Sequence, residues 1–239
     1  MLEREHVTVI IPAYNEEATI AAVVSDFRSR AGVDEVLVVD NNCRDKTAEL
    51  ARAAGARVVS EKEPGYGCAL RAGMDAANDG VLVLAEADGS FKGHDLPKFM
   101  AFLEEDTLVM GTRTTSQMVD QAANMRSILR WGNVIVGKLV EMAWYLSMEP
   151  RLTDVGCTYR ALHKSTWTKI RPGVRERGPA FSPEMMCEAL RQRIRVIEIP
   201  VHYYARMGGE SKHSANYRKV SMTALRMLRA IVRKRLSLR

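Results

Sequence analysis

The 239-residue sequence lacks several features that would place it in a specialised class of protein. It has no run of about 20 apolar residues, so we expect no transmembrane helix. The start, "MLEREHVTVII", has no basic segment followed by an apolar one, so we expect no signal peptide and a cytoplasmic location. The four cysteines form no Cys-x-x-Cys pair, which argues against a zinc site or a disulfide framework.

The sequence also lacks internal repeats, low-complexity tracts and linkers rich in proline or glycine. Its composition, with 46% hydrophobic and 27% charged residues, is ordinary for a globular chain of one domain. We therefore predict a single domain over residues 1–216, followed by a C-terminal helix over 217–239.

Acidic residues are missing from one segment in particular. Between Arg218 and Arg239 there are eight Lys or Arg and no Asp or Glu, so the net charge of +6 leaves about −2 for the rest of the chain. The pattern predicts a basic amphipathic helix, and its apolar side favours the surface of an anionic membrane as partner. A solvated helix and a contact in a homo-oligomer stay open as alternatives. No nucleic-acid recognition motif accompanies the charge, so we expect no nucleic-acid partner.

What the sequence does contain is an alternation of short apolar runs with helix-like segments. The runs predict strands at 7–12, 35–40, 56–60, 81–88 and 107–113, and the segments between the first four predict helices at 15–32, 44–55 and 65–79. This order indicates an α/β fold with a mainly parallel central sheet flanked by helices. Beyond Arg113 we expect helices at 124–148 and 181–193 and a strand at 194–205.

Polar clusters follow three of these strands: "AYNEE", "DNNCRD" and "EADGS". In parallel sheets, ligands bind beyond the carboxyl ends of the strands, so these clusters should meet. Glu86 and Asp88 stand one residue apart, and the Gly-Ser that follows ends the strand and lets both carboxylates approach one point. Oxygen ligands select Mg²⁺ or Mn²⁺, typically shared with the phosphates of a nucleotide. The alternative is two solvated acids in a turn.

Four motifs in this region resemble those of the family 2 glycosyltransferases, which have the GT-A fold. They are "PAYNEE", "VVDNNCRDKT", "EPGYGCALRAG" and "EADGS" at the position of the family's D-x-D motif. Further on, "MGTR", "RWGN", "TDVGCTYRA" and "RMGGESKHS" resemble segments of the dolichyl- and polyprenyl-phosphate sugar transferases. The resemblance spans about 7 to 216, and implies a nucleotide-sugar half at about 1–113 and an acceptor half at about 114–216.

The resemblance implies roles for individual residues. Glu86 and Asp88 would bind Mg²⁺ or Mn²⁺. The nucleotide sugar would contact Pro12, Ala13, Tyr14, Glu16, Asp40, Asn42, Gly65, Gly67, Ala87, Arg206 and Lys212. The acceptor phosphate would contact Arg113, Arg126, Arg130 and Ser211. The catalytic groups would be Asp88, Asp154, Arg206 and Lys212, with Asp154 as a base or as an orienting group near the acceptor.

The implied function is an inverting, metal-dependent glycosyltransferase. It moves a sugar from a nucleotide diphosphate sugar, with UDP preferred and GDP open as an alternative, to a polyprenyl or dolichyl phosphate at the cytosolic membrane face. A soluble hydroxyl acceptor is one alternative. Another is a non-catalytic scaffold, because Glu86 stands where the family usually has Asp. Asn41 also replaces a common Asp of the family, which bears on contacts with the nucleotide base. A sugar-1-phosphate nucleotidyltransferase would instead carry a glycine-rich loop after its first strand. His94 and His213 have no second histidine at ligand spacing, so we expect surface or structural roles for both.

Overall fold

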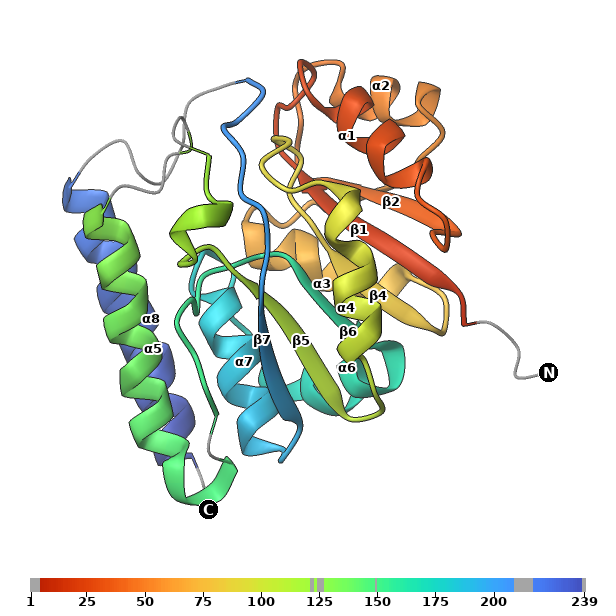
Figure 1. Cartoon of the computed structure of the whole chain (residues 1–239). Helices are drawn as coiled ribbons and strands as arrows, with labels where there is room; N and C mark the ends of the chain where they lie inside the picture. The colour runs from red at the N-terminus through yellow and green to blue at the C-terminus, as the bar shows by residue number, and fades with distance from the viewer. Residues whose placement is uncertain (1–4, 121–122, 124–126, 149, 209–216, 238–239) are drawn as a thin grey trace.

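The computed structural model of the chain describes residues 5–120, 123, 127–148, 150–208 and 217–237 (Figure 1). The strands are β1 (Val7–Ala13), β2 (Glu35–Asp40), β3 (Arg57–Ser60), β4 (Val81–Leu84), β5 (Thr107–Thr112), β6 (Arg160–His163) and β7 (Arg195–Pro200). The α-helices are α1 (Ile20–Arg28), α2 (Thr47–Ala53), α3 (Tyr66–Ala76), α4 (Leu96–Phe102), α5 (Ser127–Met148), α6 (Lys164–Ile170), α7 (Phe181–Arg191) and α8 (Tyr217–Leu236). Short 3₁₀ helices are η1 (Gly93–Asp95), η2 (Ser116–Met118) and η3 (Arg171–Gly173).

One seven-stranded sheet has the strand order β3-β2-β1-β4-β6-β5-β7. Neighbouring strands run parallel except at β6, which is antiparallel to both β4 and β5. The predicted α/β class and mainly parallel sheet are therefore confirmed. The insertion of β6 beside β4 was not predicted, and it brings residues near 158 next to the acids that follow β4.

Helices cover both faces of the sheet, which explains the continuous apolar runs in its strands. Along β4, Val81 and Val83 pack into a core with α1, α2 and α4, whereas Leu82 and Leu84 pack into a second core with α3, α6 and α7. Successive side chains of a strand point to opposite faces, so a strand buried on both sides needs apolar residues at every position.

Helices α5 and α8 lie side by side outside α7 (Figure 1). A third apolar cluster fills the space between them and includes Val140, Trp144 and Ile231. Ion pairs join α8 to α7: Arg233 lies 2.5 Å from Glu184, and Lys234 lies 2.7 Å from Glu188, and both glutamates are fully buried. Part of the basic charge of α8 thus holds it against the domain.

Two predicted strands end earlier than expected. β4 stops at Leu84, so Glu86 and Asp88 lie in the turn after it, and β7 stops at Pro200. Beyond Pro200 the chain runs alongside the acid turn, where the backbone N–H of Tyr204 donates to Ser90 O and that of Met207 donates to Asp88 O. Within the described residues, no helix combines the length and apolarity needed to cross a membrane.

Candidate active site

A cleft of about 660 Å³ opens at the carboxyl ends of β1, β2 and β4. Ten of the residues proposed for the nucleotide sugar and the metal line it: Pro12, Ala13, Tyr14, Glu16, Asn42, Gly65, Glu86, Ala87, Asp88 and Arg206. The polar clusters that follow the three strands therefore meet, as the parallel sheet predicts.

The loops after β1 and β2 hold one another through hydrogen bonds. The backbone N–H of Glu16 donates to Thr47 Oγ1 at 2.8 Å, and that of Arg44 donates to Asn15 Oδ1 at 2.8 Å. Asn15 and Asn42 adopt left-handed backbone conformations with φ of 55° and 66°, which asparagine tolerates better than most residues. This arrangement leaves the Tyr14 side chain, 46% exposed, at the cleft.

Asn41 fixes the third wall of the cleft. Its Nδ2 donates to the carbonyl oxygens of Glu61 and Glu63 at 2.9 and 2.8 Å, and its Oδ1 accepts from the backbone N–H of Gly65 at 2.8 Å. A carboxylate is an acceptor only, so Asp at this position would remove the donor to the Glu63 carbonyl oxygen and leave the Glu61 oxygen with Asn42 Nδ2 at 3.3 Å. The departure from the family's usual Asp therefore has a local structural reason.

Glu86 and Asp88 stand at the floor of the cleft, and the surroundings of Glu86 disfavour its charge. Burial, and after it the neighbouring Asp88 carboxylate, raises the pKa of Glu86 to about 7. Thr158 Oγ1 donates to Glu86 Oε1 at 2.5 Å, and the Tyr66 hydroxyl lies 2.6 Å from Thr158 Oγ1. Since the hydrogen of Thr158 points to Glu86, Tyr66 donates to Thr158, and a chain of hydrogen bonds runs from α3 to the acid.

Asp88 is 3% exposed and is held from two sides. Its Oδ1 accepts from the backbone N–H of Ser90 at 2.9 Å, and its Oδ2 lies 2.9 Å from Nη2 of Arg206. Two carboxylates and one guanidinium make a local charge of about −1 when both acids are ionised. The donor set of oxygens with an excess negative charge suits a hard divalent cation.

Arg113 and Asp154 form a second ion pair. Nε and Nη2 of Arg113 donate to the two carboxylate oxygens of Asp154 at 2.7 and 2.9 Å, and Asp154 is fully buried. The Arg113 guanidinium lies 5.3 Å from the centroid of the Tyr203 ring. The charge of Arg113 also acts to lower the pKa of Glu86, so the two acidic sites are electrostatic neighbours.

Some proposed site residues lie elsewhere. Asp40 is absent from the cleft lining, and its Oδ1 accepts from the backbone N–H of Cys43 at 2.9 Å, which fixes the turn after β2. Gly67 also lies outside the lining: an added Cβ would come within 2.3 Å of the Glu176 carbonyl oxygen, so this glycine allows α3 to pack closely against the chain before α7. Arg130 is half-buried in α5. Arg126, Ser211 and Lys212 lie outside the described residues.

Several residues in or beside the cleft were not predicted from the sequence. Arg44 and Lys62 add cationic side chains to the lining, and Tyr66 and Thr158 support Glu86. Arg44 falls inside the "DNNCRD" cluster, so its position carried a usable signal. Thr158 falls inside "TDVGCTYRA", but its approach to Glu86 could not be predicted there, because it depends on the insertion of β6 between β4 and β5.

Relatives of known sequence resemble this chain over most of its length. An uncharacterised glycosyltransferase of Mycobacterium tuberculosis (strain ATCC 25618 / H37Rv) is 35% identical over 219 residues, covering 89% of this chain and 91% of the relative. A dolichyl-phosphate hexose transferase of Haloferax volcanii is 28% identical over 207 residues, covering 85% of each chain.

Solved structures share the fold. The crystal structure of glucosyl-3-phosphoglycerate synthase from Mycobacterium tuberculosis, in complex with Mn²⁺, UDP-glucose and phosphoglyceric acid, matches with a TM-score of 0.73 at 18% identity. The match covers 97% of this chain and 80% of that one, and it confirms the GT-A fold. The model of the family described as Glycosyl transferase family 2 matches residues 8–158, more than half of the chain. From this match and the 35% identical relative, we conclude that the chain belongs to glycosyl transferase family 2 and is a glycosyltransferase.

Proposed function

We propose that this glycosyltransferase moves a sugar from a nucleotide diphosphate sugar, with UDP preferred, to a polyprenyl or dolichyl phosphate, with inversion at the anomeric carbon and with Mg²⁺ or Mn²⁺. In this reaction an oxygen of the acceptor phosphate forms a bond to the anomeric carbon. The bond from that carbon to the diphosphate oxygen breaks, and the nucleoside diphosphate leaves with the electron pair.

On the donor side, Glu86 and Asp88 would hold the divalent cation. Their oxygens, the excess negative charge and the raised pKa of Glu86 all favour a cation at this point. When bound, such an ion would offset the negative charge that develops on the leaving diphosphate. Arg206, Arg44 and Lys62 line the same cleft and supply further positive charge to the phosphates. The presence of Mn²⁺ and UDP-glucose in the structural neighbour supports this assignment.

On the acceptor side, the observation that carries the proposal is the full occupation of Asp154. Both of its oxygens accept hydrogen bonds from Arg113, and a buried carboxylate held in this way is a poor general base. An acceptor hydroxyl needs a base to remove its proton, whereas a phosphate is already an anion at pH 7. The pair therefore favours a phosphate acceptor, and we assign to Asp154 the role of orienting Arg113.

A surface beside this pair has the character expected for a lipid. Along α5, five side chains at spacings of three or four residues are exposed by 39% to 99%: Trp131, Ile135, Leu139, Met142 and Leu146. We call these five residues the α5 stripe. The α5 stripe begins close to Arg113. Asn133 lies at the same end of α5 as Trp131, and both Asn133 and Arg113 lie beside Gly156. A Cβ added to Gly156 would lie 3.6 Å from Asn133 Oδ1 and 3.4 Å from Arg113 Nη2.

The α5 stripe and the basic helix α8 together suggest peripheral binding to the cytosolic face of a membrane. Contiguous exposed apolar residues mark interaction surfaces, and neighbouring cations favour anionic lipid. Arg226, Arg229 and Arg235 are exposed on α8, next to α5. The relative named as a dolichyl-phosphate hexose transferase also supports a lipid phosphate acceptor.

The acceptor is tested by incubating the protein with radiolabelled UDP-sugars and GDP-sugars and either undecaprenyl phosphate in detergent or phosphoglyceric acid in buffer. We expect a metal-dependent, lipid-extractable product with a UDP-sugar. Label transferred to phosphoglyceric acid alone would move the acceptor to the soluble class. Binding of nucleotide without transfer to either acceptor would favour a scaffold.

Membrane binding is tested separately by sedimentation with vesicles that contain anionic lipid. The double variant Met142→Glu, Leu146→Glu should lower the partition coefficient by at least about tenfold, because two apolar side chains lose their burial in the interface. Phe102→Glu is the matched control, since Phe102 is 50% exposed on α4, away from the α5 stripe. Equal partition of both variants, or a dimer in solution that the double variant dissociates, would assign the stripe to protein association.

A further inference from the structure

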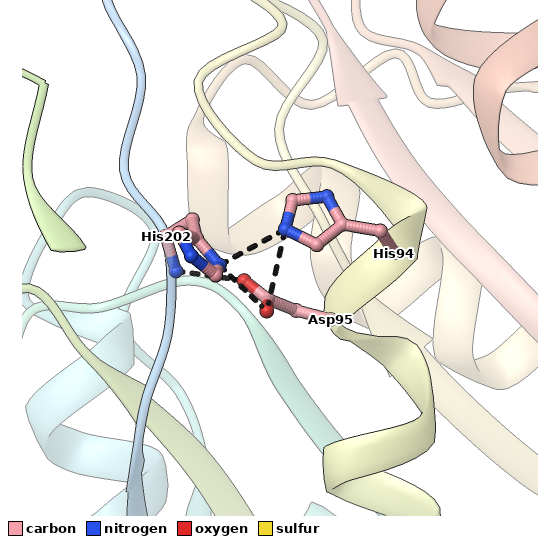
Figure 2. Close-up of side chains that lie close together, drawn as sticks. All are labelled: His94, Asp95 and His202. Atoms are coloured by element: carbon pink, nitrogen blue, oxygen red, sulfur yellow. Dashed lines mark hydrogen bonds and ion pairs between the residues drawn. The ribbon is translucent and has the colours of Figure 1, made fainter.

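A cluster of three side chains, two histidines and one aspartate, lies outside the cleft lining. His94 and Asp95 belong to η1, and His202 follows β7 (Figure 2). No second histidine stands at ligand spacing from His94 in the sequence, but the fold brings His202 into contact with it across 108 residues. Together the three side chains present two imidazole nitrogens and one carboxylate oxygen to a single point.

The distances among these three atoms suit a shared cation. Nε2 of His94 lies 2.9 Å from Nδ1 of His202, Nδ1 of His202 lies 3.0 Å from Oδ1 of Asp95, and Nε2 of His94 lies 3.5 Å from the same oxygen. Two ligands of a tetrahedral ion with bonds of about 2.0 to 2.1 Å are separated by about 3.3 Å. The triangle thus matches one face of such a site to within a few tenths of an ångström.

The surroundings already hold these ligands in place. Asp95 is fully buried, and its second oxygen accepts from the backbone N–H of His202 at 2.7 Å, which fixes the plane of the carboxylate. The two histidine side chains are 35% and 39% exposed, so an ion can reach them from solvent. A ligand held by a second hydrogen bond is typical of metal sites.

We propose that His94, Asp95 and His202 form a site for a transition-metal cation of the Zn²⁺ class, with a water molecule in the fourth position. Two imidazoles and one carboxylate favour Zn²⁺ or Co²⁺ over Mg²⁺, which prefers oxygen ligands only. The site is therefore chemically distinct from the all-oxygen pair Glu86 and Asp88.

The position of the site gives it a structural consequence for the cleft. His202 belongs to the segment 201–207, which also carries Arg206 and lies along the acid turn through the hydrogen bonds of Tyr204 and Met207. A cation bound by His94, Asp95 and His202 would join this segment to η1, directly after that turn. We infer that the ion fastens the segment that presents Arg206 to Asp88.

Lys98 competes with the ion for the same carboxylate. Its Nζ lies 2.6 Å from Oδ1 of Asp95, the oxygen assigned as ligand. An ammonium beside a metal site disfavours the bound cation through charge repulsion. Lys98→Gln should therefore tighten metal binding by several-fold, a result that a purely structural cluster would not produce.

The experiment uses the full chain with any histidine tag removed and with metals stripped by a chelator. Titration with Co²⁺ followed by its visible absorption should show one site of low coordination number, and Zn²⁺ should displace the Co²⁺. His94→Ala and His202→Ala should each lower the affinity by more than about 100-fold, since even outer-shell changes cost 10- to 100-fold. His163→Ala is the matched control, because His163 also contacts a carboxylate, Glu5 at 3.0 Å, far from the cluster.

Two further measurements keep the result unambiguous. Asp88→Asn should retain the Co²⁺ signal, which separates this site from the nucleotide cleft and makes the test independent of the proposed function. Zn²⁺ should raise the thermal midpoint of the wild type and leave that of His94→Gln, His202→Gln unchanged. Absence of Co²⁺ binding by the wild type, or equal binding by folded His94→Ala and His202→Ala, would overturn the proposal.

Discussion

Two pairs of aspartate and arginine lie near the carboxyl ends of the central strands, and they differ in how fully the acid is occupied. Asp88 contacts one guanidinium nitrogen of Arg206, whose side chain is 29% exposed. Asp154 receives both donors of the Arg113 fork and the backbone N–H groups of Arg113 and Gly156. The first pair leaves carboxylate lone pairs open to a ligand, whereas the second satisfies its acid completely.

The two pairs differ in whether the acid can accept a new partner. Asp88 can exchange Arg206 for, or share it with, an added cation, whereas Asp154 is held by Arg113. Around Asp88, a second acid with a raised pKa stands close by, so an added cation gains two partners. Around Asp154, the two buried charges offset one another, and removal of either would leave an uncompensated charge. Arg113, whose side chain is 13% exposed, therefore has a fixed position, and Asp88 has a site that a ligand can complete.

The largest expected effect comes from Asp88→Asn, which removes one negative charge from the proposed cation site of Glu86 and Asp88. We expect glycosyl transfer to fall by about 10³-fold or more, the loss typical when a group that offsets charge in the transition state is removed. The stabilisation by UDP with Mn²⁺ in a thermal shift assay should disappear as well. Asp79→Asn, in the turn before β4, is the control. Turnover by Asp88→Asn at the wild-type rate would contradict a metal site here.

The next effect distinguishes the two arginines by stability. Arg113→Met should lower the free energy of unfolding by about 3 to 5 kcal/mol, because it leaves Asp154 buried without its partner. Arg206→Met should lower it by about 1 kcal/mol or less, because that pair opens to the cleft and water can replace the guanidinium. Urea denaturation of both variants measures the difference. Equal losses would show that the two pairs are not distinct in this way.

A smaller effect follows from the raised pKa of Glu86. Its folded-state pKa of about 7 exceeds the ordinary value of 4.5, so ionisation opposes folding. The cost is absent below about pH 4.5, grows as the pH rises through 7, and is complete above it. Glu86→Gln should thus stabilise the metal-free protein by about 1 to 3 kcal/mol at pH 8, and by little at pH 5.

Chemical denaturation in the presence of a chelator, at pH 5 and pH 8, measures this change. The exposed Glu105→Gln serves as the control for the loss of one negative charge. A gain for Glu86→Gln that is the same at both pH values would mean that the carboxyl group is not titrating between them.

The smallest effect concerns Thr158→Val, which removes the donor to Glu86 and keeps the side-chain shape. The loss of one hydrogen bond to a buried acid should cost about 1 kcal/mol of stability at pH 8, where the acid is ionised. The hydrogen bond lowers the folded-state pKa of Glu86, so its loss should raise that pKa. The upper end of the pH range over which stability declines should therefore move upward. An unchanged pH profile would place the donor role of Thr158 in question.

The first half of the chain was predictable because its information is local. Alternating apolar runs and helical periodicity defined β1 to β5 and α1 to α3, and a parallel sheet brings its polar strand ends together whatever the details of packing. The early end of β4 at Leu84 was not predicted, since Ala85 continues the apolar run without a turn-forming residue. Pairing with β6 begins only at Leu84, so the partner strand defines the end.

Other parts of the site depend on contacts between distant segments. Thr158 reaches Glu86 across 72 residues, and His202 reaches His94 across 108. Spacing along the sequence carries no signal for such contacts. The sequence left two roles open for Asp154, base or orienting group, and the contact of the Arg113 fork with both of its oxygens supports the second.

The sequence by itself determined the α/β architecture, the edge of the sheet that carries the cleft and the residues that line most of it. The architecture and the edge follow from periodicity and from the direction of parallel strands, both of which are local properties, whereas the lining residues follow from the resemblance of the motifs to those of the family. Only the tertiary structure decided which acid is occupied and which is open, where the α5 stripe is exposed, and which histidines meet. Charge pairing and exposure depend on which segments pack together, and long-range packing is a property of the whole fold.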